Sequence, residues 1–217
     1  MAPILLAHPF SSYCWKALIA LHEGAVAFSL RLVEDAAGWA ELEALWPLRK
    51  FPVLRDGEAT IAESSIIVEY LARRHPGMAP LVPAAGDAAL AVRFMDRCFD
   101  NYVMTPMQQL VGDRMRAEGE HDPTGVARAR KTLDTAYAWL ETRLGTEGWA
   151  AGPGFTLADC AGAPALFYAD WVHPIDERYP RVRAYRHRVL ARPSVARVVE
   201  DARPYRHFFP GGAPGRD

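Results

Sequence analysis

The segment KFPVLRDGEATIAESSIIVEYL, residues 50–71, decides the fold of the first part of the chain. Two short apolar runs flank the turn dipeptide Asp56-Gly57, a pattern typical of a β-hairpin. Apolar residues at helical spacing between Ile66 and Leu71 then predict a helix. The segment therefore predicts two paired strands followed by a helix.

The residues before this segment predict a strand, a helix and a second strand. Residues 4–7 form a short apolar run that suits a buried strand. An amphipathic helix follows, with Ser11 or Ser12 as its N-cap and Gly24 at its end. Apolar residues then alternate over 26–32, which predicts a strand. We therefore expect residues 1–78 to form a small α/β domain.

The rest of the chain shows only helical patterns. A stretch rich in Pro, Ala and Gly predicts a linker over 79–87, and residues 88–217 predict an all-helical domain. The last seven residues, GGAPGRD, are expected to be frayed. Helices are expected near 88–117, 124–144, 157–169, 179–190 and 194–202. A small α/β domain followed by a helical one is a narrow architectural class.

Composition excludes several classes of protein. The 217 residues are 50% hydrophobic and carry a net charge of -1, so whole-chain disorder and non-specific nucleic-acid binding are excluded. Three cysteines are too few for a disulfide framework and favour a cytoplasmic location. We find no targeting segment, membrane span or metal-ligand spacing, so no nucleic acid, membrane or metal is expected.

The tetrapeptide Ser11-Ser12-Tyr13-Cys14 stands between the first strand and the first helix. A helix N-terminus presents free N–H groups and a partial positive charge, so it stabilises an oxygen or sulfur anion. The simpler interpretation is that the serines only cap the helix. Cys14 is expected to be a packed residue of low reactivity.

Two further motifs carry groups suited to a small peptide. Pro52 opens a strand, and a cis bond there would turn the adjacent backbone outward to pair with an extended peptide; a trans Pro that starts an ordinary strand is the alternative. Glu63-Ser64 opens a helix, where the helix start suits a carboxylate and Glu63 suits an ammonium group. The same pair is also an ordinary capping sequence.

In this order and spacing, the three motifs resemble the thioredoxin-like half of a cytosolic glutathione transferase. Phe155-Thr156-Leu157-Ala158-Asp159 resembles the capping box that this family carries in its helical half. The resemblance covers roughly residues 3–205. It implies an α/β thioredoxin-like N-terminal domain, an all-α C-terminal domain, and a serine-type bacterial member similar to the zeta and tau classes.

The resemblance also implies roles for individual residues. Ser11 would donate a hydrogen bond to the sulfur of glutathione, the co-substrate, with Ser12 and Cys14 as the alternatives. The remaining glutathione site would comprise Ser12, Lys50, Phe51, Pro52, Val53, Glu63 and Ser64. The acceptor pocket would be lined by Phe10, Tyr102, Met104, Met107, Gln108 and Trp171. Val53 would pair with the cysteinyl part, Glu63 and Ser64 with the γ-glutamyl end, and Lys50 with the glycyl end.

Three functions fit this resemblance. The first is a glutathione transferase, a homodimer that directs the glutathione thiolate at small hydrophobic electrophiles or peroxides. The second is a zeta-like, glutathione-dependent cis-trans isomerase, and the third is a non-catalytic glutathione-binding or assembly module. Dithiol exchange is disfavoured because Ser11 stands where glutaredoxin-like relatives have the first Cys of Cys-Pro-Tyr-Cys.

Overall fold

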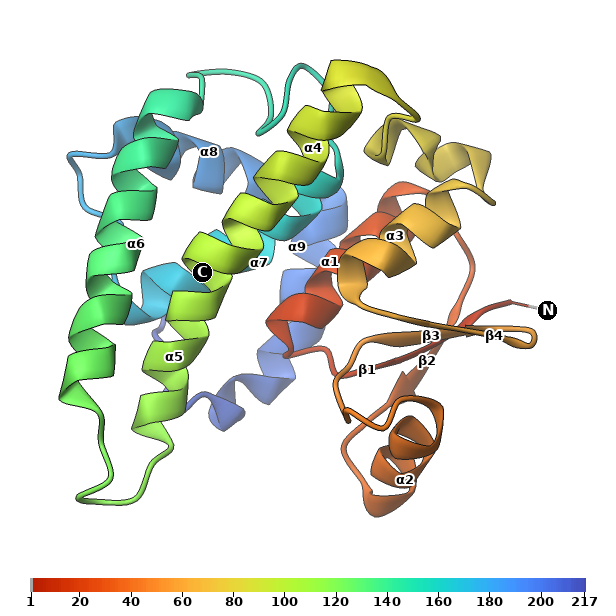
Figure 1. Ribbon diagram of the computed structural model, residues 1–217, viewed down its shortest axis with the longest axis horizontal. Helices are drawn as coiled ribbons and strands as arrows, with labels where there is room; N and C mark the ends of the chain where they lie inside the picture. The colour runs from red at the N-terminus through yellow and green to blue at the C-terminus, as the bar shows by residue number, and fades with distance from the viewer. Residues whose placement is uncertain (1) are drawn as a thin grey trace.

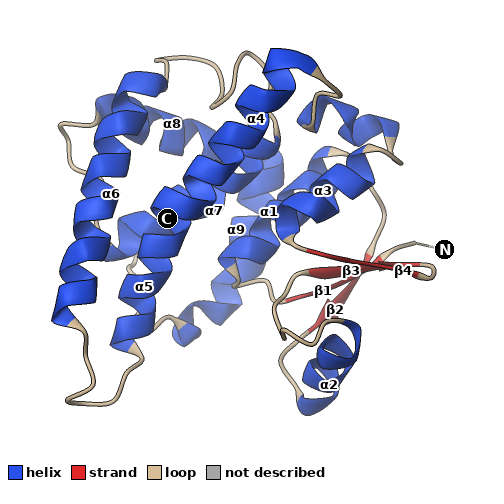
Figure 2. Ribbon diagram, in the orientation of Figure 1, coloured by secondary structure: helices blue, strands red, loops and turns tan. Residues whose placement is uncertain are grey.

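In the computed structural model, which describes residues 2–217, a small sheet with its helices lies beside a larger group of helices (Figure 1). The sheet has four strands in the order β2-β1-β3-β4. β1 pairs in parallel with β2, and the other pairings are antiparallel (Figure 2). The strands are β1 (Ile4–Ala7), β2 (Ser29–Leu32), β3 (Val53–Asp56) and β4 (Ala59–Ala62). The predicted thioredoxin-like domain is confirmed, although β2 begins three residues later than the alternation suggests.

Helices cover both faces of the sheet. α1 (Ser12–Glu23) and α3 (Ser64–Ala72) cover one face, where Leu5 belongs to the large core. α2 (Ala36–Leu45) covers the other face, where Leu6 packs with Leu42. This division follows from the alternation of side chains along a strand. The sequence patterns above contain no prediction of α2.

The predicted linker region is packed against the first helix. A 3₁₀ helix spans Pro76–Leu81, and Met78 is fully buried against the end of α1. A Cβ atom on Gly24 would lie 2.1 Å from Cγ of Met78, so only glycine allows this approach. The segment is thus ordered by tertiary contacts, and the boundary at 79–87 stays a prediction.

The five helical patterns of the second part are confirmed. The first of them is one long helix with a π-helical turn in its middle, η2 (Phe99–Met104), between α4 (Gly86–Cys98) and α5 (Thr105–Arg114). The remaining elements are α6 (Pro123–Arg143), α7 (Leu157–Val172), α8 (Pro180–Leu190), α9 (Pro193–Ala202) and η3, a 3₁₀ helix (Arg203–Phe208). Within residues 2–217, we find no helix with the length and apolar character needed to span a membrane.

The central helix α7 begins with the predicted capping box. The N–H of Thr156 donates to the carboxylate of Asp159 at 2.9 Å, and Tyr185 donates to the other carboxylate oxygen at 2.7 Å. Asp159 is fully buried, so these bonds compensate for its removal from water. The box therefore fixes the start of the helix around which the helical part packs.

The C-terminal segment is held in place, so the expectation that it is frayed is wrong. Arg216 donates to the backbone oxygen of Asp170 at 2.9 Å. Asp217 pairs with Arg203 and Arg206 of η3. Charged residues of the tail thus bind to α7 and η3, a tertiary effect that its Gly and Pro content does not reveal.

Candidate active site

The start of α1 is the first element of the site. Ser11 is the N-cap, with extended backbone, and its Oγ accepts a hydrogen bond from the N–H of Cys14 at 3.4 Å. Ser12 is the first helical residue and is 7% exposed. A helix start leaves N–H groups without partners and carries a partial positive charge. The geometry can therefore stabilise a small anion beside the Ser11 hydroxyl.

Both serines line a cavity of about 670 Å³ between the sheet domain and the helical domain, which we call the interdomain cavity. Its walls come from the start of α1, the α2 region, the α5 part of the long helix and the C-terminal segment. The lining residues are His8, Phe10, Ser11, Ser12, Val33, Glu34, Trp39, Lys50, Phe51, Met107, Gln108, Val111, Gly112, Met115, Tyr168, Phe208, Phe209 and Pro210. One polar corner thus opens onto a largely apolar chamber.

Three of the residues predicted for the acceptor pocket line this cavity. Phe10 and Met107 contribute apolar walls, and Gln108 donates from Nε2 to Oγ of Ser12 over 3.5 Å. The backbone oxygen of Phe10 accepts a hydrogen bond from Tyr168 at 2.9 Å. The loop that carries the serines is therefore held directly by the helical domain.

The other three predicted pocket residues do not line this cavity. Met104 is fully buried in the core. Trp171 is 6% exposed and lies behind Phe10, with 6.4 Å between the ring centroids. Tyr102 is 56% exposed and lines a different hollow. The sequence patterns place residues on a helix but do not show which face meets the other domain.

The strand register brings the predicted binding motifs to one edge of the sheet. Val53 pairs with Leu6 of β1 and with Ala62 of β4. The start of β3 therefore lies between the strand ends that lead to α1 and to α3. The bond between Phe51 and Pro52 is cis, as the resemblance implies.

Glu63 and Ser64 stand at the start of α3 and do not line the interdomain cavity. Glu63 is the N-cap, exposed and with a positive φ of 69°, and Ser64 is 5% exposed. The Glu63 side chain makes no capping hydrogen bond to the helix. The free N–H groups of α3 and the Glu63 carboxylate thus remain available for the two charges of an amino-acid head group.

The electrostatics of the site favour Ser11 or Ser12, rather than Cys14, as the residue that would activate a bound thiol. Burial raises the pKa of the Cys14 thiol to about 12, and the thiol is fully buried. Burial also lowers the pKa of His8, so its imidazole is neutral near pH 7. In the part of the chain that the structure describes, no group of three or more His, Cys, Asp or Glu side chains is placed to hold a metal ion.

The structure adds lining residues that the sequence patterns missed. Trp39 comes from α2, and its ring lies 5.6 Å from that of Phe51. Phe208, Phe209 and Pro210 come from the C-terminal segment. The only sequence signals were Asp35, which caps α2, and an aromatic pair inside a tail rich in Gly and Pro.

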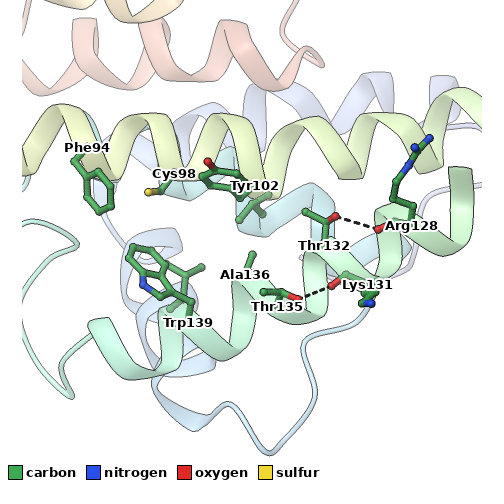
Figure 3. Close-up of a pocket in the computed structure, with 11 residues that line it drawn as sticks. Phe94, Cys98, Tyr102, Arg128, Lys131, Thr132, Thr135, Ala136 and Trp139 are labelled. Atoms are coloured by element: carbon green, nitrogen blue, oxygen red, sulfur yellow. Dashed lines mark hydrogen bonds between the residues drawn. The ribbon is translucent and has the colours of Figure 1, made fainter.

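A second hollow of about 560 Å³ lies between the long α4–η2 helix and α6, and we call it the helical groove (Figure 3). Phe94, Cys98 and Tyr102 point into it from one side and Trp139 from the other. Arg128 and Lys131 lie at one end. The groove is apolar along most of its length and contains no helix N-terminus.

The fold and the edge of the sheet define a class: a thioredoxin-like domain with a cis-proline, followed by a helical domain. A family model described as "Glutathione S-transferase, N-terminal domain" matches residues 5–79, and "Glutathione S-transferase, C-terminal domain" matches residues 123–188. Glutathione S-transferase F6 of Arabidopsis thaliana is 29% identical over 210 residues, which are 88% of this chain and 96% of the relative.

Two solved structures are similar over most of the chain. A glutathione S-transferase of Methylobacterium radiotolerans, in complex with glutathione sulfonate, is 30% identical with a TM-score of 0.80 and covers 92% of this chain and 95% of its own. One from Methylobacillus flagellatus, with glutathione bound, is 25% identical with a TM-score of 0.82 and covers 91% and 98%. The chain belongs to the glutathione S-transferase family.

Proposed function

We propose that this protein is a serine-type glutathione transferase, in which Ser11 stabilises the thiolate of bound glutathione. The observation that carries the proposal is the Ser11 hydroxyl at the start of α1, at the polar corner of the interdomain cavity. When bound, glutathione supplies the thiolate that attacks an electrophilic carbon or a peroxide. A charge-assisted hydrogen bond of about 1.5–3 kcal/mol lowers the pKa of a thiol by about one to two units.

The edge of the sheet offers one group for each part of the tripeptide. Glu63 and the N–H groups at the start of α3 suit the ammonium and carboxylate of the γ-glutamyl end. The strand that starts at Val53, next to the cis Pro52, suits the cysteinyl backbone. Lys50 lines the cavity, and its ammonium suits the glycyl carboxylate. Ser12 and Phe51 complete the proposed glutathione site.

The acceptor side of the cavity supports small apolar electrophiles as substrates. Apolar side chains such as Phe10, Met107 and Phe208 form most of its wall. Lys50 is the sole lysine or arginine among the described lining residues, and it belongs to the proposed glycyl end. A dicarboxylate enone would need cations in this chamber, so the transferase is favoured over the zeta-like isomerase.

We further propose that the protein works as a homodimer in the cytoplasm. Leu90, Phe94 and Tyr102 are 69%, 49% and 56% exposed; Phe94 and Tyr102 line the helical groove, and Leu90 lies four residues before Phe94 on the same face of α4. Exposed large apolar side chains that gather in one region are typical of an interaction surface, and a second copy would cover them together with the helical groove. The three cysteines are buried and unpaired, which suits a reducing compartment.

Two measurements test the function. Calorimetry with glutathione should show binding at micromolar to millimolar concentration; no heat at millimolar glutathione contradicts the proposal. A substrate panel with glutathione then separates the alternatives: an aryl halide, an organic peroxide, a disulfide and a maleylacetone-type enone. Turnover of the first two supports the transferase, turnover of the enone alone supports the isomerase, and binding without any turnover supports the non-catalytic module.

A further inference from the structure

A lysine is completely buried where the two parts of the chain meet. Lys16 of α1 is 0% exposed. Its ammonium donates to Asp96 at 2.7 Å, to both carboxylate oxygens of Asp100 at 2.8 and 2.7 Å, and to Oγ of Ser65 at 3.1 Å. Asp96 lies on α4 and Asp100 on η2, so one cation joins α1, α3 and the long helix of the helical domain.

A second cation, on the exposed side chain of Arg97, closes this cluster on its solvent side. Arg97 donates to Asp96 and Asp100 at 2.6 Å each and to Oγ of Ser65 at 2.5 Å. Ser65 in turn donates to the Asp96 carboxylate at 2.9 Å. Two cations and two carboxylates balance, and the Ser65 hydroxyl is the member that belongs to α3.

A buried ionic cluster is not needed for stability alone. Removing charges from water is expensive, and apolar residues of similar volume often serve a core as well or better. Such a cluster does, however, impose one geometry, because each charged group must keep its partners. The cluster therefore fixes the relative position of the elements that it joins.

The fixed geometry bears on the proposed glutathione site. Ser65 is the second residue of α3, directly after Ser64 and two residues after Glu63. Lys16 lies five residues after Ser11 on α1. The cluster thus connects the start of α3 with the helix that carries the thiol-activating serine, through side chains of the helical domain.

We propose that Ser65, held by Lys16, Asp96 and Arg97, is a positioning residue for the γ-glutamyl end of glutathione. It holds the first turn of α3 so that the free N–H groups and Glu63 already face the head group before binding. This inference rests on the proposed function. Preorganised groups improve affinity because less ordering remains to be done when the ligand binds.

The test changes Ser65, because Lys16→Met would leave two buried carboxylates with only the exposed Arg97 as their cation and destabilise the fold. Ser65→Ala removes only the link to α3. Ser194→Ala is the matched control: Ser194 is also the second residue of its helix, α9, and donates to the Glu23 carboxylate at 2.5 Å. Ser65→Thr keeps the hydroxyl and tests rescue.

We expect Ser65→Ala to raise the dissociation constant and the KM for glutathione about fivefold, the effect of one hydrogen bond. The kcat at saturating glutathione should stay within about twofold of the wild type. Ser194→Ala and Ser65→Thr should bind glutathione like the wild type. Equal affinity in Ser65→Ala and Ser194→Ala, or no rescue by Ser65→Thr, overturns the inference. Failure of the wild type to bind glutathione would instead overturn the proposed function.

Discussion

The interdomain cavity and the helical groove are similar in volume, about 670 and 560 Å³, but they differ in what surrounds them. The interdomain cavity joins the start of a helix, the edge of a sheet and a wall from the other domain. The groove lies wholly within the helical domain; apolar side chains form most of its wall, and Arg128 and Lys131 lie at one end (Figure 3). Size alone therefore does not distinguish the two hollows; the free backbone N–H groups beside an apolar chamber set the interdomain cavity apart.

The two hollows are lined by different parts of the same long helix, the groove by α4 and η2 and the interdomain cavity by α5. Tyr102 lines the groove and Met107 lines the interdomain cavity. One helix thus serves two surfaces, which is why a pocket cannot be composed from residues that are merely close in sequence.

The largest effect is expected in the groove. Phe94→Glu should weaken dimerisation roughly 100-fold, because a two-fold interface contains the residue twice and each copy loses on the order of 1.5 kcal/mol of apolar burial. Sedimentation equilibrium measures the change. Leu30→Glu is the control, an exposed apolar residue on the edge strand β2. A dimer of unchanged affinity in Phe94→Glu would remove the groove from the interface.

The second largest effect is expected for a substitution in the interdomain cavity. Ser11→Ala should lower kcat/KM at pH 7 about 30-fold, because the thiolate loses a charge-assisted hydrogen bond. The dependence of the variant's activity on pH should shift to higher pH, because the pKa of the glutathione thiol rises and the thiolate then forms only at higher pH. The ultraviolet absorbance of the bound thiolate, recorded as a function of pH, gives the shift in the thiol pKa directly. If Ser12→Ala shows this change and Ser11→Ala does not, the role belongs to Ser12.

A matched pair of variants separates the two hollows as binding sites. Phe208 and Tyr102 are both 56% exposed, but Phe208 lines the interdomain cavity and Tyr102 the groove. Phe208→Ala should raise the KM for an aryl halide about fivefold, equivalent to about 1 kcal/mol of lost apolar contact, with the glutathione KM unchanged. Tyr102→Ala should leave both constants unchanged. The reverse result would place the acceptor in the groove.

The smallest effect is expected at Cys14. With its pKa raised to about 12 by burial, the thiol is protonated throughout the range of activity, so iodoacetamide at pH 8 should not modify it in the folded protein. Mass spectrometry of the labelled peptide checks this, and labelling in denaturant is the positive control. Rapid labelling of Cys14 with loss of activity would make Cys14 a candidate for the residue that activates the glutathione thiol.

Features that depend on neighbours in the chain were predictable. The hairpin around Gly57 requires a positive φ, which is 59° here, and the Ser11 cap and the Thr156–Asp159 box are contacts over three residues. α2 escaped prediction because only Gly38 and Leu42 of it are buried, which leaves no apolar stripe in the sequence. The C-terminal segment escaped it because its order comes from ion pairs with other elements.

The sequence by itself determined the order of the elements other than α2, the two-part architecture and the serine at the start of α1, because periodicity and capping are local properties. Only the tertiary structure decided which face of the long helix meets the serines, and that Lys16 is a buried cation. Its partners, Asp96 and Asp100, lie 80 and 84 residues away in the chain. No local pattern distinguishes such a lysine from one on the surface, since its burial depends on contacts that exist only after folding.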